Sequence, residues 1–284
     1  MNPALGALLV GASCIALSPI FVRLSEVGPT ATAFWRVAFA VPFLWFFYLL
    51  KAKSHASYSG RWLLLVAAGF AFAGDLAFWH SSIQLTSVAN STLLANLASI
   101  FVTLAAWIFL RQTPTGIFLA GLAAALAGVA MLVKTSLEFS ATGLLGDALG
   151  LVTAMFYAAY ILAVKGLRDR GETALRLMAV TSTLTAVILL PVALASGEPM
   201  LPHTAYGWTI LLGLALISHA AGQGLIAYAL AHLPATFSSV GLLLQPVIAA
   251  FFAWVLLGEP LVALQIAGGL VVLLGIYLAR RGSV

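Results

Sequence analysis

Sixty consecutive residues, from Pro199 to Gly258, contain no Asp, Glu, Lys or Arg. A helix needs about 20 residues to cross the hydrocarbon core of a bilayer, so this stretch is too long for one crossing. It must turn back on itself, and the turn is predicted at Ala231-His232-Leu233-Pro234, because proline lacks a backbone donor and suits the first turn of a new helix. The corresponding turn in the first half is predicted at Leu85-Thr86-Ser87.

The whole chain has the same character. Of its 284 residues, 63% are hydrophobic and 7% are charged, which leaves too few charges to solvate a globule in water. The net charge of +5 does not indicate nucleic acid, because the basic residues are scattered rather than gathered in a patch. The single cysteine and the absence of Cys/His clusters with ligand spacing give no support for a disulfide, a metal or a cofactor. The solvent is therefore the lipid bilayer.

Ten apolar runs are long enough to span the membrane. We predict an all-α membrane protein with spans at Ala4–Leu24, Thr30–Leu50, Arg61–Gln84, Ser87–Leu110, Pro114–Lys134, Gly143–Lys165, Ala174–Ala195, Ala205–Leu230, Pro234–Leu257 and Leu261–Arg280. The termini and the even-numbered loops then carry ten basic residues, whereas the other side carries three, Arg23, Arg36 and Lys134. By the positive-inside rule, both termini are expected to be cytoplasmic.

The two halves of the chain resemble each other. A shift of 148 residues superposes Gly74 on Gly222, and a shift of 147 superposes Trp107 on Trp254 and Gly121 on Gly268. We expect two units, residues 1–140 and 141–284, of five helices each. Because five is odd, the second unit enters the membrane from the opposite face, so the repeats are expected to be inverted.

Two charged residues within the spans are the first candidates for a site. A charge in the membrane is costly and usually faces the bundle interior, so Asp75 is a candidate for proton coupling or amine binding, or else a protonated structural acid. Arg36 is a candidate contact for a substrate carboxylate; the alternatives are snorkelling to the interface and an ion pair with Glu26.

Polar amides and aromatic rings complete the predicted substrate site. Amides at matching depths in two repeats suit a central cavity, although interhelical hydrogen bonding explains them too, and rings can stack on a substrate or simply pack. The predicted lining is Asp75, Phe78, Trp79, Asn96, Tyr157, Tyr160, His219, Gln223 and Gln245, with Pro246 as a hinge. Glycines in the fifth and tenth spans predict a close contact between these helices or with a second protomer.

The chain resembles the EamA family of the drug/metabolite transporter superfamily. The resemblance rests on Leu256-Leu257-Gly258-Glu259-Pro260 followed by Gln265, Gly268 and Gly275, on Ala33-Phe34-Trp35 before Arg36, and on Pro246. The first unit departs from the pattern, with Arg111-Gln112 in place of Gly-Glu and Ser99 where a proline would match Pro246. The resemblance implies ten helices, a bacterial inner membrane location and transport of amino acids, other metabolites or drugs; YddG-like exporters of aromatic amino acids share this layout.

We therefore expect a secondary transporter that exports amino acids, aromatic ones included, by alternating access and without a cofactor. Export rather than uptake follows from the resemblance alone. Other amphiphilic metabolites or drugs are alternative substrates. An intramembrane enzyme is disfavoured because HExxH and GxSxG are absent, and a channel because a single chain supplies only two copies of the repeat. The expected partners are a small-molecule substrate and lipid, with the protein a monomer or homodimer.

Overall fold

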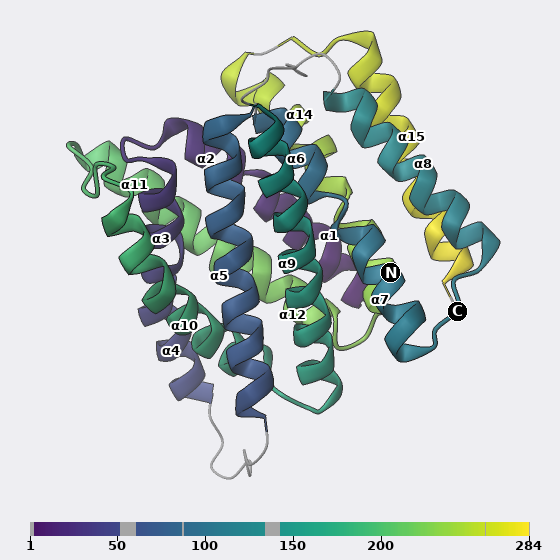
Figure 1. The fold of residues 1–284 in the computed structure, drawn as a ribbon, viewed down its shortest axis with the longest axis horizontal. Coiled ribbons are helices and arrows are strands. Elements are labelled where there is room, and N and C mark those ends of the chain that lie inside the picture. Colours follow the sequence, from purple (N-terminus) through teal and green to yellow (C-terminus); the bar gives the residue numbers. More distant parts are fainter. Residues whose placement is uncertain (1–2, 52–60, 87, 134–142, 259, 284) are drawn as a thin grey trace.

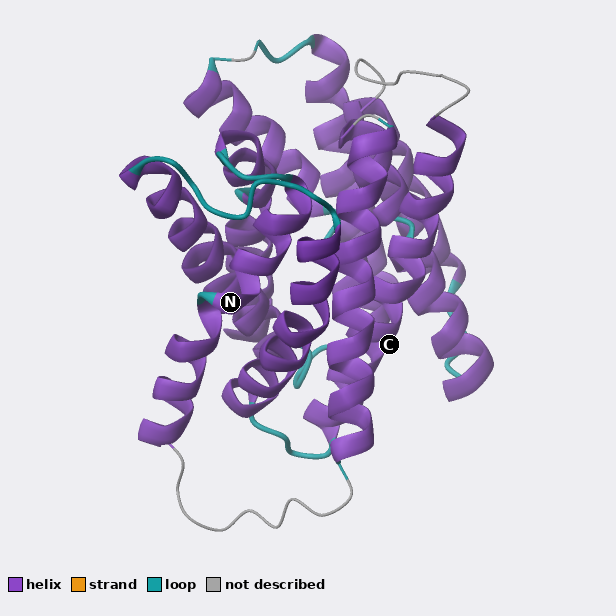
Figure 2. Cartoon of the chain, turned by 60° about the vertical axis from the view of Figure 1, so that its left-hand side comes forward, coloured by secondary structure: helices purple, strands orange, loops and turns teal. Residues whose placement is uncertain are grey.

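The computed structural model describes residues 3–51, 61–86, 88–133, 143–258 and 260–283, and within them every regular element is a helix (Figure 2). Apolar side chains alone do not determine this. In lipid each backbone N–H and C=O must be paired within the chain, and a helix does so within one segment. The predicted all-helical class is confirmed.

The first half of the chain contains eight helices, because some of its spans consist of two consecutive helices. They are α1 (Pro3–Ala16), α2 (Ser18–Leu24), α3 (Pro29–Ala38), α4 (Ala40–Lys51), α5 (Trp62–Leu85), α6 (Val88–Ala95), α7 (Ala98–Leu110) and α8 (Gly116–Val133).

The second half contains seven α-helices and one π-helical segment, η2. They are α9 (Gly143–Asp169), α10 (Ala174–Ala195), α11 (Ala205–Gly213), η2 (Leu214–Gln223), α12 (Gly224–Ala229), α13 (Ala235–Gly241), α14 (Leu244–Leu257) and α15 (Ala263–Gly282).

These elements form the ten predicted spans. Among the described residues, nine helical stretches are long and apolar enough to cross a membrane, and α8, with 18 residues, supplies the tenth. All predicted ends lie within four residues of the observed ones; the largest difference is at α9, which continues to Asp169. The turn predicted at 231–234 is observed between α12 and α13. In the first half α5 ends at Leu85 as predicted, although Ser87 of that turn lies outside the described residues.

The helices α8 and α15 lie side by side at one edge of the bundle (Figure 1). A Cβ on Gly121 would lie 2.4 Å from the Ala279 backbone nitrogen, and a Cβ on Gly128 would lie 2.6 Å from the Gly268 carbonyl oxygen. Because higher numbers on one helix face lower numbers on the other, the pair is antiparallel. The predicted glycine contact between the fifth and tenth spans is confirmed, and it forms within one chain.

The remaining spans exchange neighbours between the two halves. In the first half α5, the third span, packs on α9, and in the second half the third span, η2 with α12, packs on α1. The fourth span repeats the pattern, because α6 and α7 pack on α9 while α14 packs on α1. Each half therefore packs its third and fourth spans against the first span of the other half.

Candidate functional site

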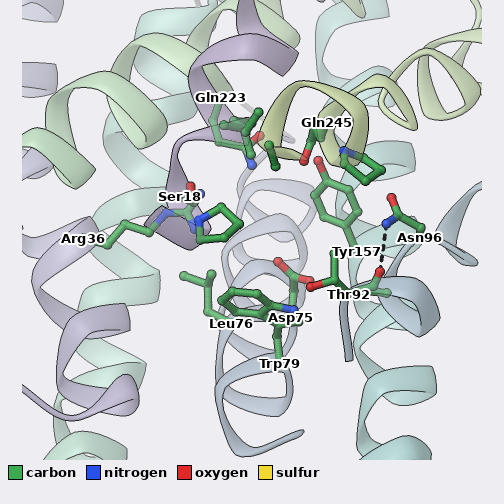
Figure 3. Close-up of a pocket in the computed structure, with 16 residues that line it drawn as sticks. Ser18, Arg36, Asp75, Leu76, Trp79, Thr92, Asn96, Tyr157, Gln223 and Gln245 are labelled. Carbon is green, nitrogen blue, oxygen red and sulfur yellow. Dashed lines mark hydrogen bonds between the residues drawn. The ribbon is translucent and has the colours of Figure 1, made fainter. Parts of the chain in front are cut away.

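A cavity of about 130 Å³ lies where spans from both halves meet (Figure 3). Its walls come from α1, α2, α3, α5, α6, α9, η2 and α14. Eight residues predicted from the sequence lie on it: Arg36, Asp75, Trp79, Asn96, Tyr157, Gln223, Gln245 and Pro246. The structure thus gathers most of the predicted polar groups in one place.

Broken helices form much of the wall. The fourth span is interrupted at Asn96 and Leu97, and the ninth at Leu242 and Leu243. Pro246 lies in the first turn of α14, where its missing N–H cannot pair with the carbonyl of Leu242. This location supports the predicted bending role of Pro246.

The fourth span bends without a proline at the corresponding position. The Asn96 side chain donates to the Thr92 carbonyl oxygen (2.8 Å), and the Ser99 hydroxyl donates to the Asn96 carbonyl oxygen (3.0 Å). Side-chain donors therefore pair carbonyl groups at the interruption, as in caps. In this way the first unit obtains a bend despite its departure from the family pattern.

The two charged residues face the cavity without pairing with each other. Asp75 on α5 and Arg36 on α3 both line it, and no ion pair within 4.0 Å joins them to any described residue. Arg36 is 5% exposed, and its Nε has no hydrogen-bond partner. A buried charge without a close partner is costly in the membrane, which makes these two groups candidates for contact with a molecule that enters the cavity.

The two alternative roles for Arg36 are contradicted. The carboxylate of Glu26 instead accepts hydrogen bonds from the backbone nitrogens of His203 (2.9 Å) and Thr204 (3.0 Å) and from the Thr204 hydroxyl. It lies at the N-terminus of α11, where the partial positive charge of the helix favours an anion. Arg36 does not snorkel to the interface, because it lines the internal cavity.

The predicted aromatic residues divide into two groups. Trp79 and Tyr157 line the cavity, and the Tyr157 hydroxyl points toward the amides of Gln223 and Gln245 (Figure 3). Phe78 instead stacks on Phe156, with ring centroids 5.3 Å apart, and does not line the cavity.

Tyr160 lies behind the cavity wall rather than on it. It is 2% exposed, packs on Phe72 at 4.7 Å and donates its hydroxyl to the Met178 sulfur at 3.8 Å. Helical periodicity could not show that Tyr157 lines the cavity and Tyr160 does not, because several faces of α9 pack against other helices.

His219 also lies behind the wall. Its Nε2 is 2.8 Å from the Ser182 hydroxyl, and its ring stacks on Phe72 at 5.3 Å. Gln223, four residues later, reaches the cavity. Both lie in η2, a π-helical run of ten residues for which the sequence analysis offered no prediction. Runs of π-helix are rare and often occur at functional sites.

Two polar residues that line the cavity, Ser18 and Thr92, were not predicted from the sequence, whereas Pro246 was. Ser18 precedes Pro19 in the middle of an apolar run, and a mid-span proline is a signal of an interrupted helix that could have identified it. Thr92 carries no such signal.

Comparisons with known proteins agree with this architecture. Residues 2–134 and 144–281 each match the EamA-like transporter family. An uncharacterized transporter of Archaeoglobus fulgidus is 30% identical and the match covers 91% of each chain. The pseudopaline exporter CntI of Pseudomonas aeruginosa is 27% identical, with 82% of this chain and 81% of that protein covered.

One further relative and one solved structure are also similar to this chain. The threonine/homoserine exporter RhtA of Salmonella typhimurium is 31% identical over 56% of this chain and 52% of its own length. A solved crystal structure matches 98% of this chain and 96% of its own with a TM-score of 0.79 at 15% identity, so the fold is shared. The two family matches, together covering nearly the whole chain, place this protein in the EamA-like transporter family of the drug/metabolite transporter superfamily.

Proposed function

We propose that this protein is a secondary transporter that exports amino acids, aromatic ones included, by alternating access. The observation that most supports this function is the cavity, which both Arg36 and Asp75 line without forming an ion pair with each other. An amino acid offers a carboxylate to the guanidinium and an ammonium to the carboxylate, and the rings of Trp79 and Tyr157 offer stacking surfaces. The exporters among the relatives support a zwitterionic substrate.

Inverted repeats would supply the two conformations that alternating access needs. Three observations support this arrangement. The family matches the chain twice, the last helices of the two halves, α8 and α15, are antiparallel, and the third and fourth spans exchange partners between the halves. A two-fold axis in the membrane plane relates contacts in this reciprocal way.

Polar contacts hold both ends of the bundle, and transport would break them alternately. On the side where the chain begins, buried Glu172 pairs with Arg176 and Arg61. On the opposite side, Glu198 accepts hydrogen bonds from the backbone nitrogens of Thr30 (2.8 Å) and Ala31 (3.2 Å) at the start of α3. We assign the first side to the cytoplasm of a bacterial inner membrane, because it carries ten of the thirteen basic residues.

Asp75 is proposed to couple export to proton entry, since a carboxylate can bind either a proton or an ammonium group. Vesicles containing the purified protein and loaded with L-phenylalanine should release it faster when a pH gradient drives protons inward. Asp75→Asn should abolish this acceleration. Asp147→Asn is the matched control, because Asp147 accepts a hydrogen bond from Thr86 (2.9 Å) away from the cavity.

The possible outcomes separate the parts of the proposal. If Asp75→Asn keeps the acceleration, Asp75 does not couple transport to protons. If the wild-type protein releases an amphiphilic drug but no amino acid, the substrate class is wrong.

A further inference from the structure

The first span is interrupted beside the cavity. Helix α1 ends at Ala16 and α2 begins at Ser18, with Pro19 in its first turn. Proline cannot donate to the carbonyl four residues earlier, and its ring clashes with that carbonyl, which favours an interruption at this point. The interruption brings Ser18 onto the cavity wall (Figure 3), together with Pro19.

Three polar atoms on this cavity are buried and without partners among the described residues. They are the Ser18 hydroxyl oxygen, the Arg36 Nε and the Gln223 Oε1. Their residues are 4%, 5% and 3% exposed and lie on three elements, α2, α3 and η2. Buried polar groups in proteins are nearly always paired, so three unpaired atoms around one cavity indicate a site for a polar ligand.

The chemistry of the three atoms selects the ligand. A guanidinium only donates hydrogen bonds and carries a fixed charge, and a serine hydroxyl can donate beside it. Water would satisfy the hydrogen bonds but would bring no negative charge into direct contact with Arg36 within the membrane. A carboxylate does both, because its two oxygens match the guanidinium fork. The unpaired oxygen of Gln223, like Asp75, is instead an acceptor and suits an ammonium group.

We propose that Ser18, at the interruption between α1 and α2, forms with Arg36 the subsite for the substrate carboxylate. Ser18 is then a specificity-determining residue that separates free acids from their amides and amines. This inference rests on the proposed function and orients the substrate within the same cavity, with its ammonium toward Asp75 and Gln223.

The test measures the thermal stabilisation of the purified protein by three probes, since a ligand that binds the folded state raises its stability. The probes are L-phenylalanine, L-phenylalaninamide, which lacks the carboxylate, and 3-phenylpropionate, which lacks the ammonium. The wild type should bind the amide at least about tenfold more weakly than the acid, as expected for the loss of a charge-assisted hydrogen bond.

The variants locate the subsite. Ser18→Ala should weaken L-phenylalanine binding about five- to tenfold and narrow the preference for acid over amide by the same factor. Arg36→Lys keeps the charge but loses the fork, and should weaken binding of both carboxylate probes. Ser13→Ala is the matched control on the same span, because the Ser13 hydroxyl donates to the Leu9 carbonyl oxygen (2.9 Å) within its own helix.

The outcomes distinguish this inference from the proposed function. If the amide binds as well as the acid, or if Ser18→Ala behaves like Ser13→Ala, the carboxylate subsite is refuted while amino-acid export stands. If the carboxylate probes bind as described but vesicles show no amino-acid release, the subsite stands and the transport proposal fails. If no probe stabilises the protein, both proposals are overturned.

Discussion

The close contact between α8 and α15 predicts how much stability the protein loses when a glycine in the contact is replaced by alanine. A Cβ added at Gly275 would lie 2.4 Å from the Ala125 backbone nitrogen, 2.6 Å from the Gly121 carbonyl oxygen and 2.7 Å from the Ala125 Cα. These atoms are backbone, so no side chain can rotate away. To reach an ordinary contact of 3.4 Å, the helices must separate by about 1 Å. Gly275→Ala should therefore destabilise the protein by about 1–3 kcal/mol, the range for overpacked interiors.

The matched control is the same substitution where space is free. A Cβ on Gly224, at the start of α12, would meet nothing within 4 Å, and its backbone is helical. Gly224→Ala should raise stability by up to about 1 kcal/mol, because alanine favours a helix over glycine. Unfolding of both variants in mixed micelles of increasing denaturing detergent, followed by circular dichroism, gives the two free energies. Equal values for the two variants would refute the steric reading of the α8–α15 contact.

Two further predictions concern the ends of the bundle. The hydrogen bond from the Thr204 hydroxyl, with those from the Thr204 and His203 backbone nitrogens, lowers the pKa of Glu26 below its usual 4.5. A carboxyl group with a lowered pKa in the folded state stabilises the protein above pH 4.5, and this stability is lost as the pH falls through the lowered value. Glu26→Gln should therefore reduce the fall in melting temperature that the wild type shows between about pH 7 and pH 3. An unchanged fall in melting temperature would contradict this prediction. Glu172→Gln should cost about 3–5 kcal/mol in detergent unfolding, because it removes the carboxylate from the buried ion pair with Arg176. Asp169→Asn, which breaks an exposed pair with Lys165, should cost less than about 1 kcal/mol, and similar losses for the two variants would exclude a special role for Glu172.

The sequence predicted the spans well because their cause is local. A run of about 20 apolar residues is stable in lipid only as a helix, whatever surrounds it. Asp75 and Trp79 are four residues apart, a spacing that puts them on one face of a helix, and both line the cavity as predicted. Pro246 marked the bend of the ninth span in the same local way.

Local pattern did not identify which face of each helix meets the cavity. In water an apolar stripe marks the buried face, but in a bilayer the lipid is as apolar as the core, so a span carries little amphipathic signal. Tyr160 and Phe78 were therefore assigned to the site although they pack behind it, and Thr92 was missed. The bend at Asn96 and the π-helical run η2 likewise have no proline to mark them.

What the sequence by itself determined is the solvent of this protein and the number and limits of its helices, since hydrophobic length is a property of each segment alone. Only the tertiary structure decided which polar groups share the cavity, because that depends on how helices from the two halves pack. Ser18, Arg36 and Asp75 lie far apart in the chain, and their common site exists only where α2, α3 and α5 meet partners from the second half.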